Sequence, residues 1–331
     1  MRPRLVVVST GGTIAMRYDP KKKGDVPAVT GQELVEAVPA LTGIASLDVV
    51  EFSNIPSFHM TPEDMLRLAR EVDALRNRAD VDGIIVTHGT DTLEESAFFL
   101  DRYLPSGKPV CFAGAMRTGG HAAPDGPYNI LSAARAASSP ALHGQGVLVV
   151  MNGEIHAARY VTKTHTSSVA TFASPLWGPL GYVEDDTILV RPFCSCPAPL
   201  RPQHLPGAVP ILKIYTGMDL ALLEAVCNMK PAGLVLEGFG RGNFPADIVP
   251  WIRQLLAEGV IVVAASRVPA GRTLGLYAAE GGGAHLHNLG VICSNQLNSQ
   301  KSRILLLLAL GLNRDREWIA GCFRENEVPQ N

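Results

Sequence analysis

The stretch Gly83-Ile84-Ile85-Val86-Thr87-His88-Gly89-Thr90-Asp91-Thr92 leads from a short apolar run into a cluster of hydroxyl groups and one carboxylate. Residues 93–100 then have the apolar spacing of an amphipathic helix. In open α/β sheets, the carboxyl ends of parallel strands and the amino ends of the following helices meet in one crevice, where ligands bind. The stretch therefore predicts a strand and a helix of a parallel α/β fold, with a ligand site between them.

A second copy of this arrangement begins the chain. The apolar run at residues 5–8 is followed by the turn Ser9-Thr10-Gly11-Gly12-Thr13-Ile14-Ala15. Each of the two predicted strand ends thus carries a threonine beside glycine. Because such strand ends lie along one edge of a parallel sheet, we expect a site built from paired hydroxyl groups.

The rest of the chain alternates short β-branched runs with amphipathic helical patterns, which is typical of βαβ units around a parallel sheet. Six prolines interrupt residues 191–210, so we interpret this segment as a linker. The alternation resumes after it and ends in an apolar helix near residues 299–310. The sequence predicts an α/β protein with two domains, a large doubly wound one with a parallel sheet at residues 1–190 and a smaller α/β one at residues 211–331.

Composition narrows the class of protein. Of the 331 residues, 47% are hydrophobic, which is enough to bury a core in two domains. Lys and Arg number 29 against 31 Asp and Glu, so nothing favours a nucleic-acid partner. No apolar segment has the length of a membrane span, no cleavable signal precedes the first strand, and the six cysteines are scattered. We expect a cytoplasmic protein with no membrane partner.

Other kinds of site are disfavoured by their missing motifs. The turn Gly11-Gly12-Thr13 could cradle a phosphate, but it matches neither the P-loop nor the dinucleotide fingerprint, which disfavours a nucleotide site and a dehydrogenase. The histidines and cysteines lack metal-ligand spacing, and the serine-hydrolase elbow G-x-S-x-G is absent. We therefore expect an enzyme without a metal or other cofactor.

Hydroxyl chemistry assisted by a lysine and a carboxylate remains. A threonine hydroxyl is a poor nucleophile until a neighbouring group removes its proton, and a neutral lysine amine can do so. Lys163 lies among hydroxyls and apolar residues in Val161-Thr162-Lys163-Thr164, and Asp91 could orient it. An exposed lysine on a β-hairpin explains the same pattern equally well.

Five segments of the chain resemble the signatures of the bacterial-type L-asparaginase family, which includes the glutaminase-asparaginases. They are Thr10-Gly11-Gly12-Thr13-Ile14-Ala15, Thr87-His88-Gly89-Thr90-Asp91-Thr92-Leu93-Glu94-Glu95, Gly114-Ala115-Met116-Arg117, Asp125-Gly126-Pro127 and Val161-Thr162-Lys163-Thr164. The likeness runs over nearly the whole chain. It implies a large N-terminal and a smaller C-terminal α/β domain, and a homotetramer built as a dimer of intimate dimers. Each site would lie between the N-terminal domain of one subunit and the C-terminal domain of its neighbour.

The resemblance also implies roles for individual residues. Thr13 would attack the side-chain amide of a small substrate, L-asparagine or L-glutamine, and form an acyl-enzyme with release of ammonia. Thr90, Asp91 and Lys163 would form a second group that transfers protons and activates water. Asp91 would also hold the α-amino end of the substrate.

The remaining implied roles concern substrate binding. Ser57 would hold the α-carboxylate, Ala115 would contact the amide, and Asn243 would reach in from the partner subunit. Backbone N–H groups at the two strand ends, near Gly12 and Gly89, would stabilise the oxyanion.

The chain departs from the family pattern around the α-amino group. Ser57 is followed by Phe58, where the family usually has glutamine, and ungapped alignment puts Ala278 where the neighbour usually supplies a glutamate. Losing both acceptors should penalise a charged ammonium. Glu280 would restore one of them if the local register shifts.

The family's first threonine is assisted by a tyrosine in a mobile lid. The lid here would be residues 16–29, and its only tyrosine is Tyr18, earlier than the family pattern expects. Two interpretations stay open: Tyr18 folds over Thr13, or it is an ordinary loop residue.

The leading hypothesis is an asparaginase-like amidohydrolase that acts on a linear amide C–N bond. Within it, hydrolysis of asparagine or glutamine competes with hydrolysis of a related amide that lacks a free α-amino group. A catalytically silent binding protein on the same fold is the alternative from another class. Lys163 argues against it, because a pure binder does not need the lysine.

Overall fold

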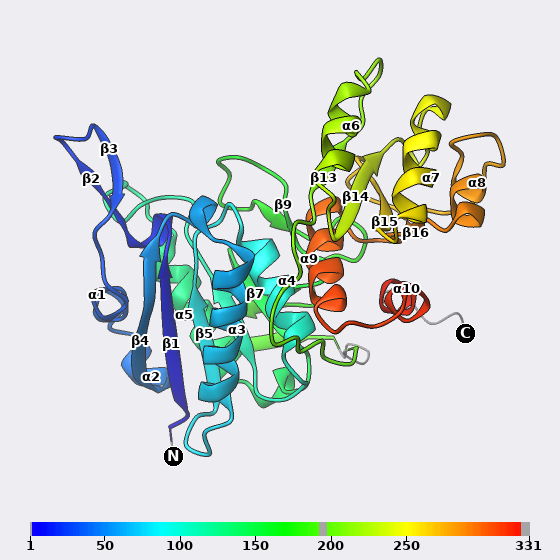
Figure 1. The fold of residues 1–331 in the computed structure, drawn as a ribbon. Coiled ribbons are helices and arrows are strands. Elements are labelled where there is room, and N and C mark those ends of the chain that lie inside the picture. The colour runs from blue at the N-terminus through cyan, green and yellow to red at the C-terminus, as the bar shows by residue number, and fades with distance from the viewer. Residues whose placement is uncertain (1, 192–196, 326–331) are drawn as a thin grey trace. The chain divides into compact units, whose positions relative to one another are not determined.

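The computed structural model describes residues 2–191 and 197–325, and Figure 1 shows their fold. The chain divides into two compact units, Met1–Pro199 and Leu200–Asn331. Each unit has its own sheet and its own helices. Residues 192–196 of the predicted linker, with Cys194 and Cys196, lie outside the described residues.

In the described part of the N-terminal unit, eight strands form one sheet in the order β12-β11-β8-β7-β6-β5-β1-β4. Five neighbouring strands are parallel: β4 (Ser46–Ile55), β1 (Arg4–Gly11), β5 (Gly83–Thr87), β6 (Val110–Ala113) and β7 (Val147–Met151). The central strands are buried on both faces, which is why they consist of uninterrupted apolar runs without alternation. This confirms the predicted α/β fold.

The sheet is mixed, and this differs from the prediction of a parallel sheet. Its remaining strands are β8 (Glu154–Ala157), β11 (Gly181–Glu184) and β12 (Thr187–Val190), each antiparallel to its neighbour. The reversal occurs at Asn152-Gly153, where both residues have positive φ angles, 51° and 77°. A two-residue turn of this kind matches the twist of antiparallel strands, so the chain makes a hairpin here instead of a helical crossover.

Helices cover both faces of this sheet (Figure 1). One face packs against α1 (Gly31–Glu36), α2 (Leu41–Ile44) and α5 (Gly126–Ala137), and the other against α3 (Pro62–Arg76) and α4 (Leu93–Tyr103). Smaller elements of the unit are η1 (Thr13–Ala15), β2 (Met16–Asp19), β3 (Gly24–Pro27), η2 (Ser57–His59), η3 (Pro140–Leu142), β9 (Thr162–Lys163) and β10 (Phe172–Ala173). Strands β2 and β3 form a hairpin that extends from the carboxyl end of β1.

The C-terminal unit is a smaller α/β layer. Its described strands form a parallel sheet in the order β13 (Ile211–Lys213), β14 (Gly233–Gly238), β15 (Ile261–Ser266) and β16 (Ile292–Cys293). Its helices are α6 (Ala221–Asn228), η4 (Ala246–Ile248), α7 (Val249–Ala257), α8 (Gly283–Leu289), α9 (Ser299–Leu310) and α10 (Arg316–Arg324). Helix α9 is the predicted apolar helix and is largely buried. None of the described helices has both the length and the hydropathy of a membrane span.

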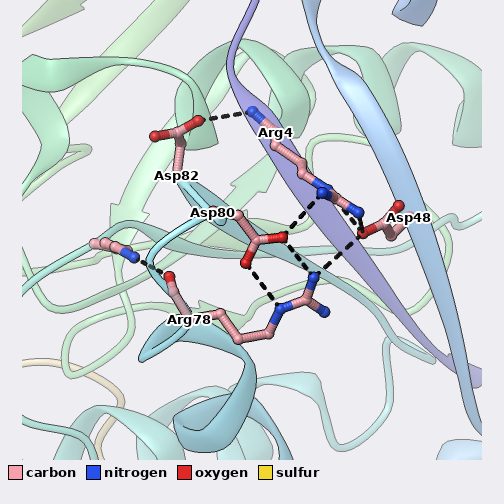
Figure 2. A network of polar contacts seen from close by, with 6 residues as sticks. Arg4, Asp48, Arg78, Asp80 and Asp82 are labelled. Atoms are coloured by element: carbon pink, nitrogen blue, oxygen red, sulfur yellow. Dashed lines mark hydrogen bonds and ion pairs between the residues drawn. The ribbon is translucent and has the colours of Figure 1, made fainter.

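A polar network joins the amino ends of β1, β4 and β5, opposite the edge where the predicted site lies (Figure 2). The Arg4 guanidinium pairs with Asp48 at 2.8 Å and Asp80 at 2.9 Å, and Arg78 pairs with Asp80 at 2.7 Å. The backbone N–H of Arg4 donates to Asp82 at 2.7 Å. The hydrogen bond from Arg78 lowers the pKa of Asp80. These side chains are 38–47% exposed, so water screens the ion pairs and the network adds little stability.

A capping box fixes the start of α3, directly after the turn that carries Ser57. Thr61 Oγ1 accepts a hydrogen bond from the Asp64 N–H at 3.1 Å, and Asp64 Oδ2 accepts one from the Thr61 N–H at 3.0 Å. Two of the helix's unpaired N–H groups are thereby satisfied.

We expect Thr61→Ala to lower the free energy of unfolding by about 1 kcal/mol, because it removes the cap oxygen. Urea unfolding followed by circular dichroism measures the change. Thr118→Ala is the matched control, since the Thr118 hydroxyl makes no hydrogen bond within residues 2–191 and 197–325. Equal unfolding midpoints for the two variants would contradict this role of the cap.

A buried histidine follows β5 directly. His88 is fully buried, its Nδ1 lies 2.8 Å from the Gly89 carbonyl oxygen, and its ring lies against Phe112. Burial lowers the pKa of His88 to about 4. The ring is therefore neutral near pH 7, and Nδ1–H donates to the carbonyl.

This burial predicts an acid-sensitive fold. Between pH 6.5 and about 4, the unfolded chain protonates at this position and the folded chain does not. The free energy of unfolding therefore falls as the pH drops through this window, by up to about 3 kcal/mol from His88 alone. We expect urea unfolding of His88→Asn to depend less steeply on pH than that of wild type. The exposed control His143→Asn should keep the wild-type slope, and an unchanged slope in His88→Asn would exclude this origin.

Candidate active site

Two glycines set the geometry of the first strand end. Gly11 and Gly12 have φ angles of 102° and 83°, in the region that favours glycine. A Cβ atom on Gly12 would lie 2.1 Å from the Cα of Gly89, so only glycine permits this approach. Thr13 follows as the first residue of η1, beside the segment that leaves β5.

The strand ends after β1, β4 and β5 meet at one place. The Thr10 hydroxyl donates to the Thr87 carbonyl oxygen at 2.9 Å, which joins the ends of β1 and β5. A Cβ atom on Gly89 would lie 2.6 Å from Ser57 Oγ, so the turn after β4 touches the same point. The structure thus brings Gly12, Gly89 and Ser57 together and places Thr13 and Thr90 next to them in the chain.

Lys163 comes from a distant segment to the same edge. Its Nζ donates to Thr90 Oγ1 at 2.9 Å and to Asp91 Oδ1 at 2.7 Å. The Lys163 side chain is 17% exposed, whereas that of Asp91 is 56% exposed. Lys163 does lie on a β-hairpin, but its amine is engaged and not free in solvent. The interpretation as a plain exposed lysine does not hold.

The hairpin under Lys163 is fixed by its own hydrogen bonds. Lys163 pairs with Phe172 across β9 and β10. Beyond that pair, the Thr164 hydroxyl donates to the Thr171 carbonyl oxygen at 2.8 Å, and the His165 N–H donates to Thr171 Oγ1 at 3.0 Å. Sequence reasoning missed Thr171. The run of hydroxyl residues after Lys163 is the sequence feature that could have indicated it, because these hydroxyls close the loop between β9 and β10.

Ser57 holds the turn that carries Asp91. Its Oγ accepts a hydrogen bond from the Asp91 N–H at 3.2 Å, and its carbonyl oxygen accepts one from the Thr92 hydroxyl at 2.8 Å. The Phe58 side chain is 63% exposed and lies against His59. Phe58 therefore presents apolar surface beside Ser57 and offers no hydrogen-bond acceptor.

The predicted substrate contact Ala115 lies in a turn held by Asp125. The two carboxylate oxygens of Asp125 accept hydrogen bonds from the N–H groups of the two residues after Ala115, at 3.0 and 2.9 Å. Asn129 donates to the Gly114 carbonyl oxygen at 2.9 Å and to Asp125 at 3.2 Å. Asn129 was missed by the sequence reasoning; its signal is an amide one helical turn after the aspartate.

The backbone donors at the strand ends are not equivalent. The N–H of Gly12 already donates to the Ile55 carbonyl oxygen at 3.0 Å. The N–H groups of Gly89 and Thr90 have no partner within the described residues. An oxyanion at this edge can therefore be stabilised from the β5 side, while Gly12 contributes close approach.

Two further residues were predicted for the site, one in each unit. Tyr18 is exposed on β2, where it pairs with Asp25, and no hydrogen bond joins it to Thr13 among the described residues. Asn243 belongs to the C-terminal unit, where its Oδ1 accepts a hydrogen bond from the Gly283 N–H at 3.1 Å. The chain just before Gly283 carries Glu280.

The cluster contains the parts that an amide-cleaving site needs. It combines a hydroxyl in contact with an amine, a carboxylate that orients the amine, and free backbone N–H groups. Within residues 2–191 and 197–325, no three side chains of His, Cys, Asp or Glu lie close enough to hold a metal ion.

Known proteins are similar to this chain over nearly its whole length. A probable L-asparaginase of Deinococcus radiodurans is 40% identical, with 98% of each chain covered. L-asparaginase 2 of Escherichia coli is 36% identical, with 98% of this chain and 93% of that one covered. The crystal structure of a probable cytoplasmic L-asparaginase from Campylobacter jejuni has a TM-score of 0.87 at 33% identity, covering 97% of this chain and 99% of that one.

Family models match both units. The model described as Asparaginase, N-terminal, matches residues 4–192, and the one described as Glutaminase/Asparaginase C-terminal domain matches residues 208–323. Together they span most of the chain, in the order of the two α/β units. The chain therefore belongs to the bacterial-type asparaginase family, whose members are hydrolases of amide C–N bonds.

Proposed function

We propose that this enzyme hydrolyses the side-chain amide of L-asparagine to L-aspartate and ammonia through a threonine ester. The observation that carries the proposal is the contact of Lys163 Nζ with both Thr90 and Asp91, at the edge where Thr13 begins its turn. Three sequence segments far apart in the chain supply a nucleophile, an amine and a carboxylate to one place. The named L-asparaginases at 36–40% identity support the same reaction.

In the first step, Thr13 Oγ attacks the amide carbon, and the carbonyl oxygen becomes an oxyanion. The free N–H groups of Gly89 and Thr90 are the available donors for this charge. The C–N bond then breaks as the nitrogen takes up the proton that the Thr13 hydroxyl gives up, so ammonia leaves. An ester between Thr13 and the aspartyl group remains.

In the second step, water hydrolyses the ester. In its neutral amine form, Lys163 Nζ takes the proton of the Thr90 hydroxyl to which it is hydrogen-bonded, while Thr90 Oγ1 takes a proton from the attacking water. Asp91 holds Lys163 in place through Oδ1 at 2.7 Å. When the tetrahedral intermediate collapses, the proton taken from water passes from Lys163 and Thr90 to the departing Thr13 Oγ, and aspartate leaves.

Substrate binding uses residues of both units. Ser57 binds the α-carboxylate, Asp91 binds the α-ammonium, Ala115 contacts the amide, and Asn243 comes from a partner subunit. This last role requires a second subunit, and the assembly we propose is a homotetramer built as a dimer of intimate dimers. Glutamine is a second, longer substrate of the same site. The likeness to a probable cytoplasmic enzyme and the free thiols of Cys111 and Cys227 support a cytoplasmic location.

Glu280 replaces the acceptor that Ala278 lacks. The turn that follows Glu280 is held to Asn243, because the Gly283 N–H donates to Asn243 Oδ1 and the Gly281 carbonyl oxygen accepts from the residue after Asn243. Glu280 thus stays beside the residue that reaches the substrate, and its side chain is exposed.

The exposed Phe58 beside Ser57 favours a second candidate, hydrolysis of an amide without an α-amino group. Phe58 would contact such a substrate with apolar surface, where an ammonium would need an acceptor.

We expect Thr13→Ala and Lys163→Met each to lower ammonia release from asparagine by about 10³-fold or more, because each removes a reacting group. Lys108→Met is the matched control: its Nζ bonds the Arg78 carbonyl oxygen at the far edge of the sheet, so activity should stay at the wild-type level. Circular dichroism checks that the variants are folded. Substantial residual activity in either site variant would remove the assigned mechanism.

A substrate comparison separates the two candidate functions. With asparagine and succinamic acid as substrates, we expect Glu280→Gln to raise KM for asparagine about tenfold and to leave KM for succinamic acid unchanged, since only asparagine carries an ammonium. Glu224→Gln, an exposed change on α6, is the control. Wild-type preference for succinamic acid over asparagine would favour the second candidate and reject the first.

A further inference from the structure

A cavity of about 470 Å³ lies beside the catalytic turn and contains none of the four catalytic residues. It is lined by residues of η1, strand β2, helix α1, the loop at residues 115–124 and the start of α5. Its volume is within the range of sites that bind small organic molecules.

The floor of this cavity is apolar. Ile14, Leu34, Val38 and Ile130 line it, and all four are buried. Ile14 packs closely over Gly126, where a Cβ atom would lie 3.0 Å from its Cγ1. Because Ile14 directly follows Thr13 in η1, an occupant of the cavity would touch the back of the turn that carries the nucleophile.

The charged groups at the cavity's rim favour an anion. Arg17 is already neutralised by Glu33, which it contacts at 3.5 Å. Arg117 uses one N–H on the Ala123 carbonyl oxygen at 3.1 Å, and its guanidinium has no other partner among the described residues. The nearby Asp125 carboxylate is occupied by three N–H donors of its own turn and helix. One half-buried cation therefore faces an apolar chamber with its remaining donors open.

We propose that this cavity is a second binding site, for a small amphipathic carboxylate with an aryl or alkyl tail. The carboxylate pairs with Arg117, and the tail lies on the floor formed by Ile14, Leu34 and Ile130. A guanidinium offers paired N–H groups that match the two oxygens of a carboxylate. None of Thr13, Thr90, Asp91 and Lys163 lines this cavity, and the only proposed substrate contact among its lining residues is Ala115.

Titration calorimetry of the full chain with 4-phenylbutyrate tests the proposal. We expect saturable binding of the carboxylate, and binding at least about tenfold weaker for 4-phenylbutylamine, which has the same tail and the opposite charge. Saturating L-aspartate should not displace 4-phenylbutyrate, since the two sites are separate. Displacement by L-aspartate, or equal binding of the amine, would overturn the proposal.

Variants locate the site. Arg117→Gln should weaken 4-phenylbutyrate binding about tenfold, because it removes the cation and keeps a donor for Ala123. Ala37→Trp, at an exposed position on the rim, should abolish binding by filling the cavity. Arg314→Gln, which changes an exposed arginine of the C-terminal unit, should bind as wild type does. Unchanged binding in both cavity variants would place the ligand elsewhere and reject the site.

Discussion

The close approach of Gly12 and Gly89 is the constraint on which the site depends. A Cβ atom added at either glycine would collide with a neighbour. At Gly12 it would lie 2.1 Å from the Cα of Gly89, and at Gly89 it would lie 2.6 Å from Ser57 Oγ. Gly12 and Gly89 therefore meet backbone to backbone, and the Ser57 side chain lies against Gly89. This contact is what lets the hydroxyl of Thr13 and the group around Thr90, which leave different strands, serve one substrate of the size of an amino acid.

The packing of the central strands, and not surface charge, holds Gly12 and Gly89 together. Residues of β1, β5, β6 and β7 are buried on both faces, so their register is set by packing against helices on either side. The network around Arg4 and Asp80 joins the amino ends of β1, β4 and β5, but its side chains are partly exposed and screened by water. It refines an arrangement that the core already determines.

The sequence predicted the features that local patterns carry. The apolar runs that end in hydroxyl clusters correctly predicted β1 and β5. These strands are parallel neighbours, so their carboxyl ends lie side by side, as expected. The antiparallel extension was missed because its signal is one Asn152-Gly153 dipeptide. For Lys163 the sequence left two interpretations open, an amine held by Asp91 and an exposed hairpin lysine. Its partners Asp91 and Thr90 lie 72 and 73 residues away in the chain, and no local pattern encodes such a contact. Tyr18 and Asn243 depend on arrangements between segments that a single chain's pattern does not specify.

Asp91 bears most directly on the choice of substrate. Its Oδ1 holds Lys163, while its Oδ2 makes no hydrogen bond within the described residues and is open to solvent. A substrate with an α-ammonium can replace the water on Oδ2 with a charged donor. A substrate without one would strip that water and leave a carboxylate oxygen unpaired, at a cost of about 1–3 kcal/mol, or roughly 5- to 150-fold in affinity. Phe58 offers only partial burial of one ring in return, which is the smaller effect. The carboxylate that positions the catalytic amine therefore also favours an amino acid as the substrate.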